Sequence, residues 1–128
     1  MKLLLDTHIW LWTWLEPIRL VSRVRQQLQD QTNELWLSPI STWEVLLLQA
    51  KGKVKLQPPP EIWIARAMQE FHEAPLTHEI TLVSQQLNLH PDPADRFLAA
   101  TAKVLGLTLV TADARLLACG DIKTLSNR

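Results

Sequence analysis

The sequence predicts an α/β protein built around a central, mainly parallel β-sheet. Short apolar runs alternate with longer segments of helical periodicity, which is the pattern of parallel α/β proteins. Proline directly follows a capping residue in Ser38-Pro39 and Asp92-Pro93, which marks two helix starts, and Gly52 and Gly106 follow helical runs. At 128 residues, we expect one domain over positions 1–128.

The elements follow from these patterns in chain order. Strands are expected at Lys2–Leu5, Glu34–Leu37, Ala74–Leu76 and Leu107–Val110, with a weaker strand near Asp121–Thr124. Helices are expected from about His8, over Ile18–Asp30 and Pro39–Lys51, and then over Pro60–Phe71, Ile80–Leu87 and Pro93–Leu105.

The overall composition is that of a globular protein and favours no particular partner. Thirteen basic and thirteen acidic side chains cancel, so any attraction to nucleic acid must come from a local patch. The single cysteine, Cys119, excludes an internal disulfide and is typical of a reducing compartment. Asp6 and His8 interrupt the apolar N-terminus before a signal peptide forms, and no run is of transmembrane length, so we expect a cytoplasmic protein without a membrane partner.

Two acids lie where strands are expected to end. Asp6 follows the strand Leu3-Leu4-Leu5, and Asp113 lies just past the strand that ends at Val110. Ligands bind at the carboxyl edge of open α/β sheets, so these acids can face one crevice. Helix capping is the alternative role for each of them.

Glu44 and Asp95 are further candidates, each with a structural alternative. Glu44 has apolar neighbours in almost every direction, which makes an unpaired charge costly. It serves a capping box if its helix begins at Ser41, but lies inside the helix if the helix begins at Ser38. Asp92 is the natural N-cap of the next helix and Asp95 stands in its first turn, so we assign Asp92 mainly to the cap and Asp95 to the site.

Four acids brought together would raise one another's pKa values unless a cation neutralised them. An all-carboxylate set suits Mg²⁺ or Mn²⁺ better than zinc. The histidines, His8, His72, His78 and His90, have no paired metal-ligand spacing, so we expect surface or packing roles, with His8 as the exception because it lies two residues from Asp6.

Four segments, in this order, resemble the PIN-domain nucleases and in particular the VapC-type toxins of bacterial toxin–antitoxin pairs. They are Leu4-Leu5-Asp6-Thr7-His8, Ser41-Thr42-Trp43-Glu44, His90-Pro91-Asp92-Pro93-Ala94-Asp95-Arg96 and Leu109-Val110-Thr111-Ala112-Asp113. The resemblance implies a three-layer α/β/α sandwich, an acidic quartet at Asp6, Glu44, Asp95 and Asp113, and supporting roles for Thr7, Asp92 and Thr111. It also implies Mg²⁺ or Mn²⁺ dependence, endonucleolytic cleavage of RNA, inhibition by a cognate antitoxin, and a homodimer.

A mechanism follows as a hypothesis. Asp6 and Asp95 would hold the metal, with Glu44 and Asp113 binding directly or through water, and hydrolysis would leave a 5′-phosphate and a 3′-hydroxyl. The alternatives are a PIN-like nuclease of RNA processing without an antitoxin, and a non-enzymatic phospho-receiver domain. The receiver fold expects adjacent acids after its first strand, whereas Thr7 follows Asp6 here.

Basic residues near the expected site are candidates for phosphate contacts. They are Arg96, Lys51, Lys53 and Arg115. Solvated surface side chains are the alternative for the lysines, and a pair with Asp92 is the alternative for Arg96.

The first helix is apolar on all faces. Its segment Ile9-Trp10-Leu11-Trp12-Thr13-Trp14-Leu15 is richer in apolar side chains than an outer-layer helix of a small domain can bury. We therefore expect Trp12 or Trp14, with Trp43, to line a groove for an antitoxin segment or a dimer partner, while core packing and RNA stacking remain alternatives.

Overall fold

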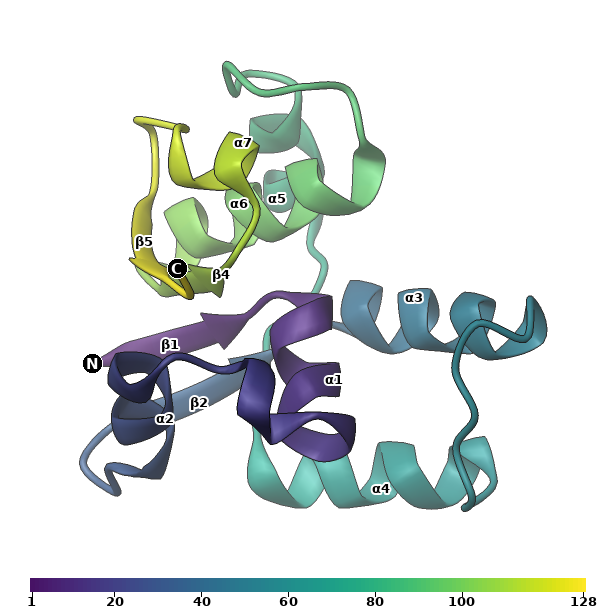
Figure 1. Ribbon diagram of the computed structural model, residues 1–128. Coiled ribbons are helices and arrows are strands. Elements are labelled where there is room, and N and C mark those ends of the chain that lie inside the picture. The colour runs from purple at the N-terminus through teal and green to yellow at the C-terminus, as the bar shows by residue number, and fades with distance from the viewer.

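The computed structural model describes residues 1–128 and contains one five-stranded sheet in which every neighbouring pair of strands is parallel (Figure 1). The strands are β1 (Lys2–Leu5), β2 (Glu34–Leu37), β3 (His72–Glu73), β4 (Thr108–Thr111) and β5 (Lys123–Ser126). Their order is β3-β2-β1-β4-β5, so β1 lies at the centre between β2 and β4. The predicted α/β fold with a parallel sheet is confirmed.

Seven α-helices and one 3₁₀ helix connect the strands. They are α1 (Thr7–Leu15), η1 (Pro17–Arg19), α2 (Ser22–Gln29), α3 (Pro39–Ala50), α4 (Pro60–Glu70), α5 (His78–Ser84), α6 (Pro93–Leu105) and α7 (Ala114–Leu117). None of these helices is long and apolar enough to cross a membrane.

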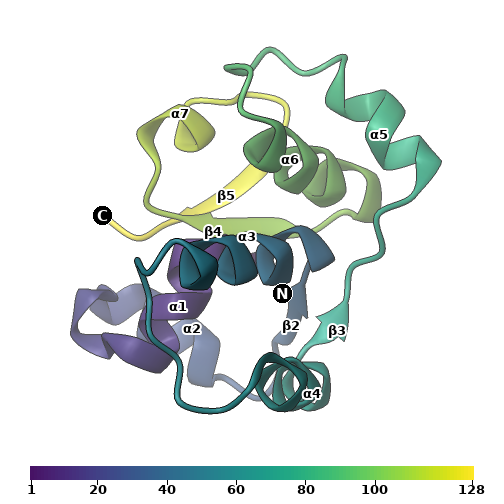
Figure 2. The ribbon, with the colours of Figure 1, turned by 90° about the vertical axis from the view of Figure 1, so that its right-hand side faces the viewer.

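The sheet separates two hydrophobic cores, because successive side chains of a strand point to opposite faces. Leu3 and Leu5 pack with α1, α2 and α4 on one face, whereas Leu4 packs with α5, α6 and α7 on the other. Figures 1 and 2 show these helices as layers on either side of the sheet. This arrangement is the three-layer α/β/α sandwich expected from the sequence.

The carboxyl ends of β1, β2 and β4 meet at one edge of the sheet, beside α3. Asp6 continues from β1, and its backbone N–H donates to the carbonyl of Val110 in β4 at 3.0 Å. Ser38 follows β2 and caps α3 through a bond from the Ile40 N–H to its hydroxyl at 3.1 Å. The topology therefore brings the starts of α1 and α3 to the same edge as the end of β4.

The helix predicted over Ile18–Asp30 is wrong at its start, since η1 and α2 are separated by extended backbone at Leu20 and Val21. Asn127, near the C-terminus, explains the break. Its side-chain oxygen accepts from the Val21 N–H at 2.8 Å, and its side-chain nitrogen donates to the carbonyl of Arg19 at 3.1 Å. A partner more than one hundred residues away thus replaces the helical hydrogen bonds.

The strand predicted over Ala74–Leu76 is also misplaced, because β3 ends at Glu73 and only the N–H of Ala74 still bonds to β2. Pro75 has no N–H with which to extend the ladder. The weak strand expected near Asp121–Thr124 lies two residues later, as β5.

Two helical predictions need correction as well. The helix expected over Ile80–Leu87 begins earlier, at His78 after its cap Thr77, and ends at Ser84. The short helix α7 was not predicted, because four residues are too few for a periodic pattern.

Candidate active site

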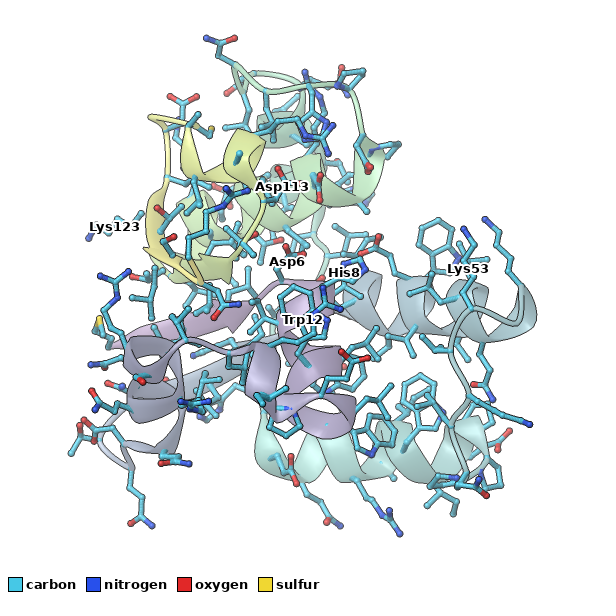
Figure 3. All side chains as sticks on the ribbon, viewed as in Figure 1. Asp6, His8, Trp12, Lys53, Asp113 and Lys123 are labelled. Carbon is cyan, nitrogen blue, oxygen red and sulfur yellow. The ribbon has the colours of Figure 1, made fainter.

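A cavity of about 330 Å³ opens at the carboxyl edge of the sheet, and five carboxylates line it. Its lining residues are Asp6, Glu44, Asp92, Asp95 and Asp113, together with His8, Trp12, Ala112 and Arg115. We call this cavity the acid pocket. Figure 3 shows Asp6, His8 and Trp12 near one another, with Asp113 above them. The structure therefore brings together all four acids that the sequence singled out.

Asp6 is the most enclosed of these acids, with 8% of its surface exposed. Its Oδ1 accepts from the Thr7 N–H at 2.8 Å, so it caps α1, and its Oδ2 accepts from the Thr111 hydroxyl at 2.7 Å. Burial raises the pKa of Asp6, although these two hydrogen bonds oppose the rise. The capping alternative is correct, and yet the carboxylate also faces the acid pocket.

Glu44 lies inside α3, because the helix begins at Pro39 after the Ser38 cap and not at Ser41. The Thr7 hydroxyl contacts both an oxygen of Glu44 and the Ser41 hydroxyl. Burial and the nearby charge of Asp6 raise the pKa of Glu44. The capping box is therefore excluded, and Thr7 links the start of α1 to the carboxylate of α3.

Asp92 caps α6 as predicted, Asp95 stands in the first turn of that helix, and both residues line the acid pocket. Asp92 is the N-cap, since its Oδ1 accepts from the Ala94 N–H at 3.0 Å and, more weakly, from the Asp95 N–H at 3.4 Å. Burial first, and then the charges of the other pocket acids, raise the pKa of Asp95 to about 7. The ionised form of the Asp95 carboxyl group is therefore disfavoured in the pocket.

His90 approaches this group although the sequence suggested only a surface or packing role. Its Nε2 lies 3.1 Å from Oδ2 of Asp95, but outside hydrogen-bond geometry, so the contact is electrostatic in character. Its Nδ1 accepts from the Asp92 N–H at 3.4 Å, which favours the tautomer with the hydrogen on Nε2. The five-residue separation from Asp95 did not reveal this contact, because the chain turns back at Pro91.

Asp113 caps α7 and pairs with Arg115, so the capping alternative is correct for this acid too. Its Oδ1 accepts from the Arg115 N–H at 2.8 Å, and the Arg115 guanidinium lies 3.1 Å from its Oδ2. This guanidinium holds the pKa of Asp113 below its ordinary value. The Thr111 hydroxyl, which donates to Asp6, accepts from the Asp113 N–H at 3.1 Å. Thr111 thus joins the two acids that follow β1 and β4.

The acid pocket has the chemistry of a hard-metal site. All its carboxylates supply oxygen ligands, which suit Mg²⁺ or Mn²⁺, and Arg115 is the only arginine or lysine among its lining residues. The raised pKa values of Asp6, Glu44 and Asp95 indicate negative charge that a cation would relieve. In the structure, no three acidic or histidine side chains lie close enough together to surround one ion.

Arg96 does not face the acid pocket, which corrects its expected role as a phosphate contact. Its guanidinium donates to the backbone carbonyls of Ser84, Leu87, Leu89 and His90. The bonds to Ser84 and His90 measure 2.7 and 3.0 Å. Arg96 therefore holds the loop between α5 and α6, and with it the backbone of His90.

The other expected basic residues lie around the pocket. Lys51, at the end of α3, lines a neighbouring cavity together with Trp43 and Glu44. Lys53 lines another cavity together with Trp12. Arg115 stands at the acid pocket itself.

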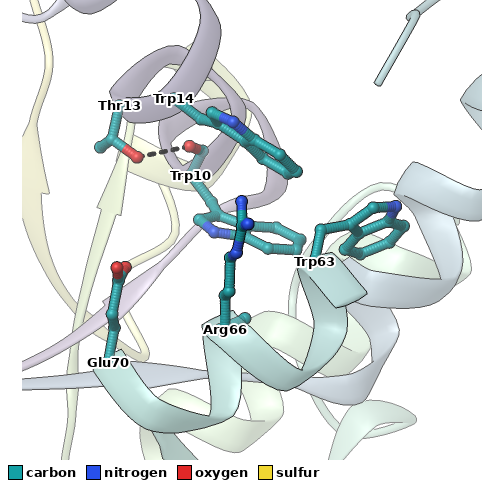
Figure 4. A pocket seen from close by; sticks show the side chains of 7 residues that line it. Trp10, Thr13, Trp14, Trp63, Arg66 and Glu70 are labelled. Atoms are coloured by element: carbon teal, nitrogen blue, oxygen red, sulfur yellow. Dashed lines mark hydrogen bonds between the residues drawn. The ribbon is translucent and has the colours of Figure 1, made fainter. Parts of the chain in front are cut away.

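The tryptophans do not share the single groove expected from the sequence. Trp10 is buried in the core, and with Trp14 and Trp63 it lines a cavity of about 320 Å³ between α1 and α4 (Figure 4). Arg66 and Glu70 of α4 complete this tryptophan pocket. Trp12 lies instead at the acid pocket, and Trp43, which is 51% exposed, lies beside it on α3. The apolar helix α1 thus serves two separate surfaces.

The chain resembles known proteins along nearly its full length. The family profile described as PIN domain matches residues 3–121. The chain is 33% identical over 115 residues to Ribonuclease VapC22 of Mycobacterium tuberculosis (strain ATCC 25618 / H37Rv), an alignment that covers 88% of each protein.

Solved structures with low sequence identity share the fold. VapBC2 from Rickettsia felis, bound to a DNA fragment from its promoter, has a chain that superposes with a TM-score of 0.73 at 16% identity and 98% coverage of both chains. A chain of DNA-bound VapBC from Salmonella typhimurium gives a TM-score of 0.71 at 16% identity, with 100% of this chain and 99% of that chain covered.

Replacing Asp95 by Asn is expected to stabilise the metal-free protein at alkaline pH. Folding raises the pKa of Asp95 from 3.8 to about 7, so the folded state binds more protons within this window and its stability falls as the pH rises through it. Thermal unfolding in EDTA should give a higher midpoint for Asp95→Asn than for the unaltered protein at pH 8, and equal midpoints near pH 4.

The matched variant Asp113→Asn should behave in the opposite way. Folding lowers the pKa of the Asp113 carboxyl group. Ionised Asp113 therefore contributes stability above pH 3.8, and this contribution is lost as the pH falls. Asp113→Asn should therefore lower the midpoint at pH 8. A lower midpoint for Asp95→Asn in EDTA at pH 8 would contradict the proposed repulsion.

Replacing Arg96 by Lys is expected to destabilise the fold by about 2–3 kcal/mol, because one ammonium group cannot satisfy four carbonyls around a planar guanidinium. Urea denaturation measures the loss. Arg115→Lys, at an exposed ion pair, is the control and should change stability by less than about 1 kcal/mol. Unchanged stability of Arg96→Lys would exclude the structural role.

Proposed function

The chain belongs to the PIN domain family, and from this premise we propose that it is a metal-dependent endoribonuclease and the toxin of a type II toxin–antitoxin pair. The observation that carries the proposal is the convergence of Asp6, Glu44, Asp95 and Asp113 on one cavity at the carboxyl edge of the sheet. The relative from Mycobacterium tuberculosis bears the name of a ribonuclease, which supports RNA as the substrate.

Asp6 and Asp95 are the proposed metal ligands, with Glu44 and Asp113 binding directly or through water. Ribonucleases of this family generally use divalent metal ions, and we propose Mg²⁺ or Mn²⁺ here. Such an ion lowers the pKa of a bound water and neutralises charge on a phosphate. The raised pKa values of Asp6, Glu44 and Asp95 support this assignment, because a cation returns these groups to their ionised forms.

The residues around the acids have positioning roles in this proposal. Thr7 and Thr111 hold Asp6 by one hydrogen bond to each carboxylate oxygen, which limits its rotation. Asp92 caps α6 and so fixes the backbone of Asp95. Arg115 lies next to Asp113 at the pocket, where its guanidinium can pair with a phosphate of the strand.

The proposed reaction is hydrolysis by in-line displacement. The water oxygen forms a bond to phosphorus, and the bond from phosphorus to the 3′ oxygen breaks. The water proton leaves through the carboxylates of the pocket, and the 3′ oxygen is protonated as it departs. The products are a 5′-phosphate and a 3′-hydroxyl, and no side-chain nucleophile takes part.

Replacing Asp6 by Asn should abolish RNA cleavage while preserving the fold. Asn keeps the cap of α1 but removes the charge from the proposed metal ligand, so we expect a loss of more than about 100-fold in the rate with Mg²⁺. The rate is measured on a mixed single-stranded RNA, with circular dichroism to verify folding. Asp30→Asn, at an exposed acid at the end of α2, is the matched control. Equal cleavage rates for Asp6→Asn and the unaltered protein would refute the assignment of Asp6 to the active site.

We further propose an antitoxin as the protein partner, with the tryptophan pocket as its docking surface. The pocket is open, has three tryptophan walls, and carries Arg66 and Glu70 at its rim, which offer both charges to an inserted segment. The VapC relative and the VapBC complexes of similar fold support a partner of this kind. The homodimer expected from the sequence stays a prediction.

Expression of this chain alone should arrest the growth of a bacterial host, and co-expression of the proposed antitoxin, sought as a small protein encoded next to the gene, should relieve the arrest. Arg66→Glu should weaken inhibition of the purified ribonuclease by that protein about tenfold or more, because it reverses a rim charge. Lys103→Glu, on the exposed side of α6, is the control. Arrest without relief would favour a nuclease of RNA processing that has no antitoxin.

A further inference from the structure

A second cavity of about 280 Å³ adjoins the acid pocket, and His8 and Trp12 line both. Its other lining residues are Leu11, Leu15, Glu16, Arg19, Leu48, Lys53 and Val54. We call it the side pocket. The catalytic hypothesis assigns no role to this cavity, although its shared lining makes it continuous with the proposed site of cleavage.

The side pocket has the composition of a nucleotide site. Trp12 provides a flat aromatic wall, and Leu15, Leu48 and Val54 provide an apolar floor. Arg19 and Lys53 supply two positive charges, opposed only by Glu16. An aromatic plane beside cationic side chains is the arrangement that binds single-stranded nucleic acid, in which bases stack and phosphates pair. A purely apolar partner would leave the charges of Arg19 and Lys53 unused.

The indole of Trp12 is already stacked against a flat cation. The guanidinium carbon of Arg19 lies 4.2 Å from the centre of the indole ring, and the His8 ring centre lies 6.1 Å away. The Arg19 side chain is 53% exposed, and its only ion pair, to Glu16 at 3.4 Å, is a surface pair of small energy. Arg19 is therefore free to exchange the indole face for a phosphate when a base arrives.

The spacing along α1 suits a nucleotide next to the scissile phosphate. Asp6 caps α1, and Trp12 lies six residues later, about 9 Å along the helix axis. His8 stands between them on the same face as Trp12, one turn earlier. Figure 3 shows His8 and Trp12 side by side next to Asp6. An RNA strand with one phosphate at the acids thus reaches the side pocket with its neighbouring base.

We propose that the side pocket binds the nucleobase adjacent to the scissile phosphate of single-stranded RNA, with Trp12 as the stacking residue and Arg19 and Lys53 as contacts for the next phosphate. This inference rests on the proposed ribonuclease function and deepens it, because it names the residues that select the substrate. Stacking tolerates every base, so the pocket favours unpaired RNA over duplex without reading a particular base.

The experiment is a double-mutant cycle between Trp12 and the base. The probe is a mixed-sequence single-stranded RNA of about 30 nucleotides whose cleavage site has been mapped with the unaltered protein. Two modified versions of this RNA each carry one abasic nucleotide, placed immediately 5′ of the scissile phosphate in one and immediately 3′ of it in the other. Removal of the base at one of these positions should reduce kcat/KM by roughly 5-fold to 150-fold, which is the value of one stacked base. Trp12→Leu should cause a loss of the same size on intact RNA and no further loss on the abasic RNA.

Two further variants make the outcome decisive. Trp12→Phe keeps an aromatic plane and should recover most of the activity, which covers the case that Trp12→Leu fails to fold. Trp36→Leu removes a partly buried tryptophan of β2 that packs on His72, away from both pockets, and should leave kcat/KM and the effect of the abasic nucleotide unchanged.

The possible failures are distinguishable. If the unaltered protein cuts no RNA with Mg²⁺, the proposed function fails, and the side pocket inference fails with it. If the protein cuts RNA but the losses from Trp12→Leu and the abasic nucleotide multiply, or Trp12→Leu matches the unaltered protein, only the stacking proposal fails. Loss of inhibition by the partner protein, with unchanged RNA cleavage by Trp12→Leu, assigns the side pocket to that partner and also refutes the proposal.

Discussion

Burial of the carboxylates of Asp6, Glu44 and Asp95, reinforced by repulsion from neighbouring acids, is the constraint on which the carboxyl edge of the sheet depends. Each of these acids is partly or fully withdrawn from water, and burial together with the neighbouring charges raises its pKa. The fold tolerates the arrangement because hydroxyl and amide groups surround the acids: Thr111 donates to Asp6, and Thr7 contacts Glu44. These bonds are local and leave the negative charge uncompensated. Unfavourable electrostatics of this kind is typical of a site that is completed by a ligand.

Helix capping and the site use the same side chains. Asp6, Asp92 and Asp113 each accept hydrogen bonds from the first turn of a helix, and each also lines the acid pocket. Capping stabilises the helix starts and at the same time aims a carboxylate at the crevice, since all three helices begin at the carboxyl edge of the sheet. An acid that precedes a helix in this fold can therefore act both as the helix cap and as part of the site. Thr111 adds a physical link, because its single hydroxyl connects the acids that follow two neighbouring strands.

The apolar helix α1 accounts for the two surfaces outside the acid pocket. Trp10 and Trp14 pack towards Trp63 of α4, whereas Trp12, which lies between them in sequence, faces the acid pocket and the side pocket. A helix rotates by about 100° per residue, so Trp12 points about 200° away from Trp10, whereas Trp14 points only about 40° away from Trp10. A protein partner at the tryptophan pocket and RNA at Trp12 would thus contact the same helix from two sides.

Local signals in the sequence determined most of the fold and indicated which acids meet at the carboxyl edge of the sheet. The parallel sheet was predicted from the apolar runs. The starts of α3 and α6 were predicted from Ser38-Pro39 and Asp92-Pro93, because such features depend on neighbours within a few residues. Tertiary structure alone decided the rest. The break before α2 depends on Asn127, the role of Arg96 depends on four carbonyls of a preceding loop, and the approach of His90 to Asp95 depends on the path of the chain at Pro91. Each is a contact between groups whose pairing leaves no periodic trace. The sequence therefore indicates the four acids and their supporting residues Thr7, Asp92 and Thr111, but not the distant contacts of Asn127, Arg96 and His90.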